Sequence, residues 1–175
     1  MLQAMVDPIV VDAPKRPENP AVSAVVRVLR NYQIRQDRIF IIKKLGLQKT
    51  DWVDLNRLAN LLGYFGLRVF VRVHSEYYRL KPSPQSLVMV LHQINGESAF
   101  SFVLEVNSDI VLLEAKTGKI SKWRRLDFER SWWSKAYCSE TREMVWFHRW
   151  YLKCYKPACA SLKPACASLK PAYPN

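Results

Sequence analysis

The passage DLNRLANLLGYFGLRVFVRV, residues 54–73, changes from a helical pattern to a strand pattern near its middle. Its first half repeats apolar residues at helical spacing, and Gly63 or Gly66 supplies the stop. Residues 67–73 then run or alternate in the apolar pattern of a β-strand. We therefore place the boundary between a helical part and a sheet part of the chain inside this passage.

Two more helices are expected before this boundary. Residues 20–34 carry apolar side chains at helical spacing, with Asn19 as the N-cap and Pro20 at the first helical position. Residues 36–47 predict a second, short helix that ends near Gly46. Three helices therefore come first.

Strands dominate after the boundary. Apolar runs joined by NGE and NSD turns, which are typical of hairpins, predict strands at residues 86–93, 99–106 and 109–115. A short helix with Phe128 and Trp132 facing inward is expected at 126–132, and a last strand at 134–138. Helices followed by a mostly antiparallel sheet predict the α+β class.

The composition narrows the classes of possible ligand but does not identify one. The chain has 175 residues, 49% of them hydrophobic, and a formal charge of +12. This suits one compact domain plus a tail, with a surface that attracts acidic peptide, nucleic acid or anionic lipid. No signal peptide and no apolar run of about 18 residues is visible, so we expect a cytoplasmic location.

The cysteines and histidines predict no metal site and no cofactor. The four cysteines lie in the last quarter of the chain without CxxC pairing, and the three histidines are scattered. Free thiols are expected in this compartment.

The chain divides into four segments on these patterns. We expect an extended entry segment at residues 1–17, a folded domain at 18–140 and an aromatic, basic linker helix at 141–155. Residues 156–175 repeat the unit KPACASL, and this composition predicts disorder because it cannot bury a core.

Three phrases resemble the bacteriocin-processing, double-glycine cysteine peptidase family over roughly residues 18–139. They are the opening passage, VLEVNSDIVLLEAKTGK (103–119) and LDFERSWWSKAYC (126–138), of which the last is the most specific. The resemblance implies a papain-like fold, with helices packed on a mostly antiparallel sheet. It also implies a site made of a Cys at the start of the first helix, a His on a strand, an Asp in a turn and an upstream Gln.

The catalytic residues that the family requires are not retained at the matching positions. The resemblance places Pro20 at the nucleophile, Phe100 at the imidazole and Glu114 at the acid, and the oxyanion glutamine falls near Pro14. A thiolate and an imidazole are needed to attack and to move the proton, so we predict a degenerate peptidase rather than an enzyme. Glu114 alone keeps a carboxylate, and we interpret it as a turn residue.

A replacement pair elsewhere is not expected. His92 on the second predicted strand would have to reach Cys138 on the last. Cys138 lies within a strand, without a helix N-terminus to lower the pKa of its thiol, so we interpret it as a buried structural cysteine.

The resemblance is nearest to the peptidase-like domains of haemolysin-type type I secretion ABC exporters, which implies a domain that holds a secreted polypeptide without cutting it. An exporter at the inner face of the membrane is the implied partner, and the basic charge favours an acidic client. The residues expected to bind this client are Trp133, Tyr77, Tyr78, Lys122, Arg124 and Arg125.

Two alternatives stay open. Basic and aromatic residues together permit nucleic-acid binding, although no recognised motif supports it. An active double-glycine leader peptidase with a rewired site is the third hypothesis.

Overall fold

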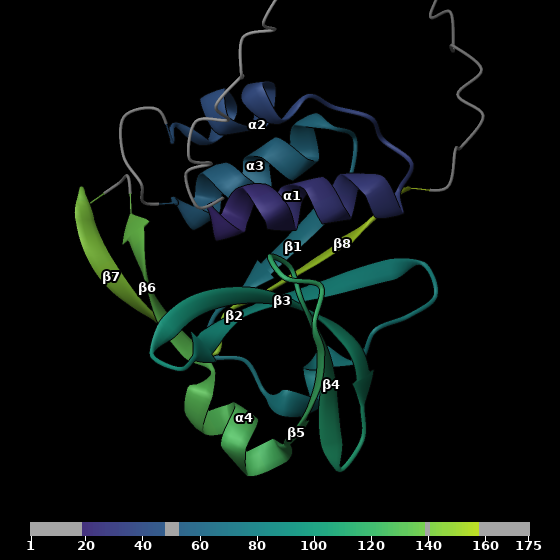
Figure 1. The fold of residues 1–175 in the computed structure, drawn as a ribbon, viewed down its shortest axis with the longest axis vertical. Helices are drawn as coiled ribbons and strands as arrows, with labels where there is room; N and C mark the ends of the chain where they lie inside the picture. Colours follow the sequence, from purple (N-terminus) through teal and green to yellow (C-terminus); the bar gives the residue numbers. More distant parts are fainter. Residues whose placement is uncertain (1–18, 48–52, 139–140, 158–175) are drawn as a thin grey trace, which may run out of the picture.

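The computed structural model describes residues 19–47, 53–138 and 141–157. Three helices lie on one face of a six-stranded sheet, and a short helix covers part of the other face (Figure 1). A two-stranded ribbon extends at the side of these layers. This arrangement confirms the α+β class.

The three N-terminal helices are capped by side chains that the sequence supplies. They are α1 (Pro20–Asn31), α2 (Arg38–Leu45) and α3 (Leu55–Tyr64). Asn19 accepts a hydrogen bond from the Ala21 backbone N–H at 3.0 Å, so its predicted role as N-cap is confirmed. Asp37 and Asp54 cap α2 and α3 in the same way.

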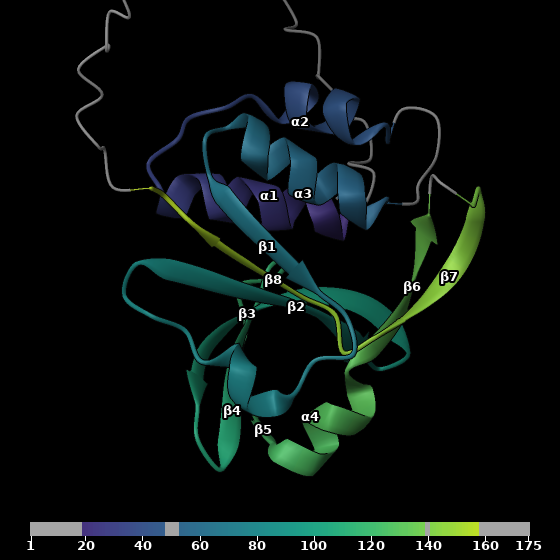
Figure 2. The ribbon, with the colours of Figure 1, turned by 180° about the vertical axis from the view of Figure 1, so that it is seen from behind.

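The turn from α3 into the sheet depends on Gly66. Its φ of +81° is in the left-handed region that favours glycine. The Leu67 N–H donates to the Leu62 carbonyl at 3.3 Å, which closes the end of α3. The chain then descends as β1 (Arg68–Arg72) from the end of α3 (Figure 2). The predicted change of pattern is therefore a helix-to-strand turn.

The main sheet has the order β1-β8-β2-β3-β4-β5, and every neighbouring pair is antiparallel. Its other members are β2 (Ser86–Ile94), β3 (Glu97–Val106), β4 (Asp109–Glu114), β5 (Ile120–Arg124) and β8 (Tyr151–Tyr155). The hairpin between β2 and β3 turns at Asn95 and Gly96, both with positive φ. The three predicted central strands are confirmed, whereas β5 was not predicted.

The predicted linker helix at residues 141–155 is wrong. This segment forms β7 (Glu143–His148) and β8, and β8 lies between β1 and β2 in the main sheet. Leu152 and Cys154 are fully buried on the face of β8 that meets the helices. The aromatic and apolar residues that suggested a helix are instead needed to fill a central strand. The sheet therefore extends past the predicted boundary at residue 140.

The C-terminal strands also pair differently from the sheet that the sequence suggested. The helix α4 (Arg125–Ser131) confirms the predicted short helix, and Phe128 and Trp132 are buried as expected. The strand after it, β6 (Trp133–Cys138), pairs with β7 in the separate ribbon rather than joining the main sheet. The ribbon therefore stands beside the sheet.

Two apolar cores lie on the two faces of the sheet. The larger core packs α1, α2 and α3 against residues such as Met89, Leu91 and Phe100. The smaller core packs the 3₁₀ turn Tyr77–Leu80 and α4 against the opposite face. Among the described residues, no helix is long and apolar enough to cross a bilayer.

Candidate functional site

Two adjoining cavities form a cleft between the helical layer and the sheet. The first, which we call the apolar cavity, has a volume of about 180 Å³, and the second, the polar cavity, has about 390 Å³. Pro20, Ser98 and Phe100 line both, so the two cavities meet at the start of α1. The other residues of the apolar cavity are Asn19, Val53, Leu55, Leu91, Lys135 and Ala136. The polar cavity adds Ile94, Asn95, Glu97, Ala99, Glu114, Lys116 and Thr117.

The fold brings together the three positions that the resemblance assigned to catalysis. Pro20 begins α1, Phe100 lies on β3, and Glu114 ends β4, and all three line the polar cavity. The Ala115 N–H donates to the Phe100 carbonyl at 2.8 Å, which holds the end of β4 beside β3. Residues far apart in the sequence therefore meet at one end of the cleft.

Phe100 closes this end of the cleft with an apolar ring. Its side chain is 5% exposed and contacts Trp150 edge to face, with 6.1 Å between the ring centroids. The ring provides surface for an apolar contact but no proton acceptor.

Glu114 has a local role in the turn that follows β4. Its Oε2 accepts a hydrogen bond from the Thr117 hydroxyl at 2.7 Å, and its backbone carbonyl accepts from the Gly118 N–H at 2.9 Å. The backbone of Gly118 has a φ of +75°, and the Arg27 guanidinium lies against it. These contacts fit the interpretation of Glu114 as a turn residue.

Ser98, which lines both cavities, is hydrogen-bonded to a buried serine behind it. The Ser98 and Ser134 hydroxyls are hydrogen-bonded to each other, and the Gln93 amide donates to both at 3.2 Å. Ser134 is fully buried, so this small network joins the β2–β3 hairpin to β6. No imidazole lies among the described residues that line the cleft, and neither serine has a base to activate it.

His92 lies outside the cleft, on the opposite face of the sheet. Its ring is fully buried, with Trp123 and Phe128 as neighbours at centroid distances of 5.6 and 5.9 Å. Nε2 lies 2.9 Å from the Ser101 hydroxyl, whereas Nδ1 has no partner within the described residues. Burial lowers the pKa of this imidazole to about 4, because charging it in the apolar core is costly.

Cys138 does not line the cleft either. It lies half-buried at the end of β6, while His92 points into the smaller core. The described residues that line the two cavities include no cysteine. A thiol and an imidazole are therefore not brought together in the cleft from these two positions.

Most of the residues predicted to bind a client gather on the other side of the sheet. Tyr77 is buried, 5% exposed, and packs against Phe128, so its prediction as a surface residue is wrong. The Arg125 guanidinium covers the Tyr77 ring at 5.0 Å and also pairs with Glu129 at 3.1 Å. These contacts belong to the layer of α4, which lies across the sheet from α1 (Figure 1).

The remaining predicted residues of this group do not line the cleft. Lys122 pairs with Asp109 at 3.2 Å along the β4–β5 hairpin, and Arg124 is exposed at the end of β5. Tyr78 is 59% exposed and donates a short hydrogen bond to Glu76. A rim of basic side chains therefore exists, but it does not surround the two cavities.

Of the residues predicted to bind a client, Trp133 is the nearest in sequence to a residue that lines the cleft, Lys135. Trp133 contacts Trp146 across the ribbon, with 5.0 Å between ring centroids, and its Nε1 donates to the Arg130 carbonyl at 2.9 Å. Lys135 covers the Trp146 ring at 4.4 Å and also lines the apolar cavity. Sequence reasoning missed Lys135, although its exposed position in an alternating strand was the available signal.

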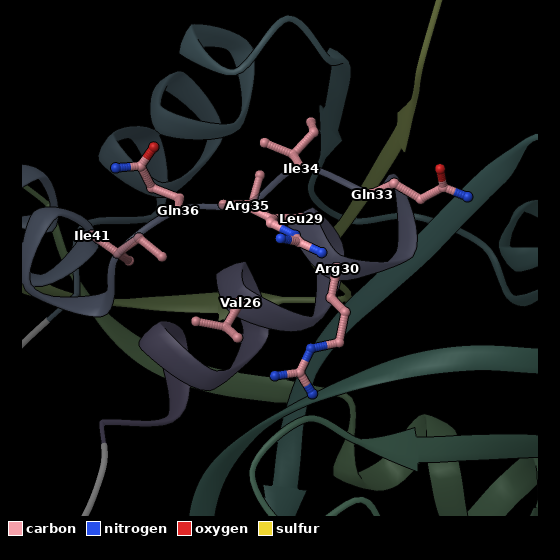
Figure 3. Close-up of a pocket in the computed structure, with 8 residues that line it drawn as sticks. All are labelled: Val26, Leu29, Arg30, Gln33, Ile34, Arg35, Gln36 and Ile41. Carbon is pink, nitrogen blue, oxygen red and sulfur yellow. The ribbon is translucent and has the colours of Figure 1, made fainter.

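A further pocket lies away from the cleft. It has a volume of about 620 Å³ and lies between the end of α1 and α2 (Figure 3). Arg30 and Arg35 line it over an apolar floor that includes Val26 and Ile41. Pro20, Phe100 and Glu114 do not line it, and Pro14 lies outside the residues that the structure describes. Nor do the described residues bring together three side chains of the types that bind a metal.

Comparison with known proteins identifies the fold. No family model matches the chain, and no curated protein matches it. A solved structure matches, the peptidase domain of Streptococcus ComA, a bi-functional ABC transporter involved in a quorum sensing pathway. The match covers 78% of this chain and 90% of that chain, with a TM-score of 0.55 and 6% sequence identity. The predicted papain-like α+β fold is therefore confirmed.

Proposed function

We propose that this domain binds an extended or unfolded secreted polypeptide without cutting it, as part of an ABC exporter system for type I secretion. The observation that carries the proposal is the composition of the cleft. The resemblance assigns Pro20 and Phe100 to the positions where those peptidases have a thiol and an imidazole, and both residues line the polar cavity. The likeness to the ComA domain supports the exporter context.

The cleft lacks the chemistry of a thiol peptidase at these positions. Proline carries no nucleophile, and phenylalanine can neither accept a proton nor orient a leaving group. Glu114 is the one carboxylate among the three positions, and its hydrogen bond to Thr117 serves the turn. We therefore propose that the fold keeps its groove and has lost its reaction.

The two cavities suit successive side chains of an extended peptide. The apolar cavity, walled by residues such as Leu55 and Leu91, suits an aliphatic or aromatic side chain. Side chains of an extended chain alternate in direction, so pockets on either side of a bound backbone can receive different residues. Binding would use surface contacts rather than chemistry.

The charged residues that line the two cavities balance, two lysines against two glutamates, so an acidic client would depend on a single cation. Lys116 and Lys135, rather than Lys122, Arg124 and Arg125, are the cations that line the cavities. Glu97 and Glu114 lie beside Lys116 in the polar cavity, so Lys135 at the apolar cavity is the cation best placed to meet an acidic residue. We place the domain in the cytoplasm, at the inner face of the membrane when it is joined to its exporter.

The test blocks the cleft and asks whether binding is lost. Ser98 is exposed and lines both cavities, so Ser98→Trp should fill the junction. The probe is fluorescein-labelled, reduced and carboxymethylated α-lactalbumin, an unfolded acidic chain, and binding is followed by anisotropy. We expect Ser98→Trp to weaken binding at least about tenfold, which corresponds to about 1.4 kcal/mol.

The matched control adds an indole elsewhere. Leu126 is 66% exposed on α4 and lines neither cavity, so Leu126→Trp should bind the probe as the unmodified protein does. Incubation with a double-glycine leader peptide should release no fragment. Cleavage of that peptide, or equal binding by Ser98→Trp and the unmodified protein, would contradict the proposal.

A further inference from the structure

The edge strand β1 has a groove beside it that is separate from the cleft. The groove has a volume of about 640 Å³ and lies between α3 and β1. The residues that line it are Asn56, Ala59, Asn60, Gly63, Leu67, Val69 and Val71. None of them lines the apolar or the polar cavity.

The groove exists because α3 presents small side chains to it. Ala59 and Gly63 lie one helical turn apart on one row of α3, and the exposed Asn56 and Asn60 form the row beside it. A methyl group placed on Gly63 would meet no atom within 4 Å, so the space above this residue is open. A larger side chain there would occupy the groove.

The free edge of β1 lies along this groove. In the part of the chain that the structure describes, β1 pairs with β8 on one side and with no strand on the other. An unpaired strand edge presents backbone N–H and C=O groups that can hydrogen-bond to an added chain. The groove therefore adjoins a row of backbone donors and acceptors.

The side chains of β1 differ on its two faces. Val69 and Val71 are half-buried and line the groove, whereas Arg68, Phe70 and Arg72 are exposed on the opposite face. The ring of Phe70 stacks on that of Tyr155 with 5.9 Å between centroids. An added strand would meet aliphatic surface on one face and two cations on the other.

The two arginines are available to such a partner and oppose self-association. Neither Arg68 nor Arg72 forms an ion pair with an acidic side chain of the described residues. If β1 paired antiparallel with β1 of a second copy about Phe70, Arg68 of one copy would lie opposite Arg72 of the other. Like charges directly opposite are destabilising, which argues against a second copy as the occupant.

We propose that β1 binds an extended polypeptide segment in which aliphatic and acidic residues alternate. The segment adds to the free edge as a strand, with its aliphatic side chains in the groove beside Val69 and Val71. Its acidic side chains then lie beside Arg68 and Arg72. Five residues of strand span about 17 Å, so a segment of about this length is enough. The groove is lined by aliphatic and amide side chains, which favours a polypeptide, and a nucleic acid that stacks on the exposed Phe70 is an outcome that the test separates.

The test compares two peptides of one composition. The first is a fluorescein-labelled peptide that alternates aspartate and valine, and the second groups the same residues in two blocks. We expect the alternating peptide to bind at least about tenfold more tightly, because only alternation places the two kinds of side chain on opposite faces. Methylation of alternate backbone nitrogens of the alternating peptide removes the N–H groups along one edge of it. When that edge faces β1, the peptide can no longer donate hydrogen bonds to the strand, so we expect binding to be abolished.

Variants of the protein distinguish binding at β1 from nonspecific attraction of the acidic peptide to a basic protein. Arg68→Glu with Arg72→Glu should weaken binding of the alternating peptide at least about tenfold. Arg130 is exposed on α4, away from β1. Arg130→Glu should change the affinity for the alternating peptide by no more than about twofold, once the change in net charge is corrected for. Gly63→Leu should fill the groove and also weaken binding, while it improves helix propensity by up to about 1 kcal/mol and so keeps the domain folded.

Several outcomes would overturn the proposal. Equal binding of the alternating and block peptides would show simple charge attraction, and unchanged binding by Gly63→Leu would exclude the groove. A single-stranded oligonucleotide that competes as well as the peptide would identify a nucleic-acid surface instead. The proposal does not rest on the cleft, because Ser98→Trp should bind the alternating peptide normally whether or not the proposed function holds.

Discussion

Removal of the buried imidazole of His92 should abolish a specific part of the pH dependence of stability. The ring is fully buried beside Trp123 and Phe128, and burial lowers its pKa to about 4, against 6.5 for an accessible histidine. The unfolded chain therefore binds a proton more readily than the folded chain between these two pKa values. Stability that is present above pH 6.5 is lost as the pH falls toward 4.

The magnitude follows from the two pKa values. A difference of one pKa unit corresponds to ~1.4 kcal/mol, so protonation of His92 in the unfolded chain can remove at most about 3.5 kcal/mol. Between pH 7 and pH 5 the expected loss is about 2 kcal/mol, because the unfolded imidazole is almost fully charged at pH 5 and the folded one is mostly neutral.

Urea unfolding of the unmodified protein and of His92→Leu, measured from pH 7.5 to pH 4.5, isolates this contribution. The variant should lose the hydrogen bond to Ser101, which lowers its free energy of unfolding by about 1–3 kcal/mol at pH 7.5, and this deficit should shrink as the pH falls. Its free energy of unfolding should then fall less steeply with acidity than that of the unmodified protein. His74→Gln, at an exposed histidine, is the matched control and should keep the full dependence. Parallel curves for the unmodified protein and His92→Leu would refute the reasoning.

Two further predictions concern the junction of α1 with the sheet. The Tyr32 hydroxyl donates to the Cys154 carbonyl at 2.7 Å and accepts from the Leu87 N–H at 3.2 Å, so Tyr32→Phe should lower the free energy of unfolding by about 1–3 kcal/mol in urea titrations. A loss below about 0.5 kcal/mol would show that water replaces the hydroxyl. Burial raises the pKa of the Cys154 thiol to about 12, so this cysteine should resist iodoacetamide at pH 8 until the protein unfolds, as mapped by peptide mass spectrometry. Rapid labelling of native Cys154 would contradict its burial.

Local pattern predicted the elements whose signals lie within a few turns of chain. Asn19 and Pro20 mark the start of α1, and the period change at Gly66 marks the entry to β1. Capping and side-chain periodicity depend on neighbours in the sequence, so they can be recognised without knowledge of the fold. The resemblance added the positions of Phe100 and Glu114, which the structure places in one cavity with Pro20.

The strands at the C-terminus could not be recognised in this way. Residues Tyr151–Tyr155 pair with Arg68–Arg72 on one side and with residues of β2 on the other. Pairing partners at such a separation in sequence leave no local signal, and an aromatic-rich segment reads equally well as a helix. The position of β8 in the sheet is therefore decided by its pairing with strands that are distant in the sequence.

For the residues predicted to bind a client, the sequence likewise shows the residue type but not the location in the fold. The basic character of Lys122, Arg124 and Arg125 is visible in the sequence, but the face of the sheet on which they lie is not. The position of Lys135 at the apolar cavity depends on the ribbon of β6 and β7, which stands outside the main sheet.

By itself, the sequence determined a basic chain of the α+β class, and it carried the prediction that proline and phenylalanine stand where a peptidase of this kind needs a thiol and an imidazole. Only the tertiary structure decided which side chains share the cleft, and which edge strand is left without a neighbour beside its groove. The physical reason is that residue type and period act over one or two turns of chain. Faces, edges and cavities arise from contacts between segments that the chain separates by tens of residues.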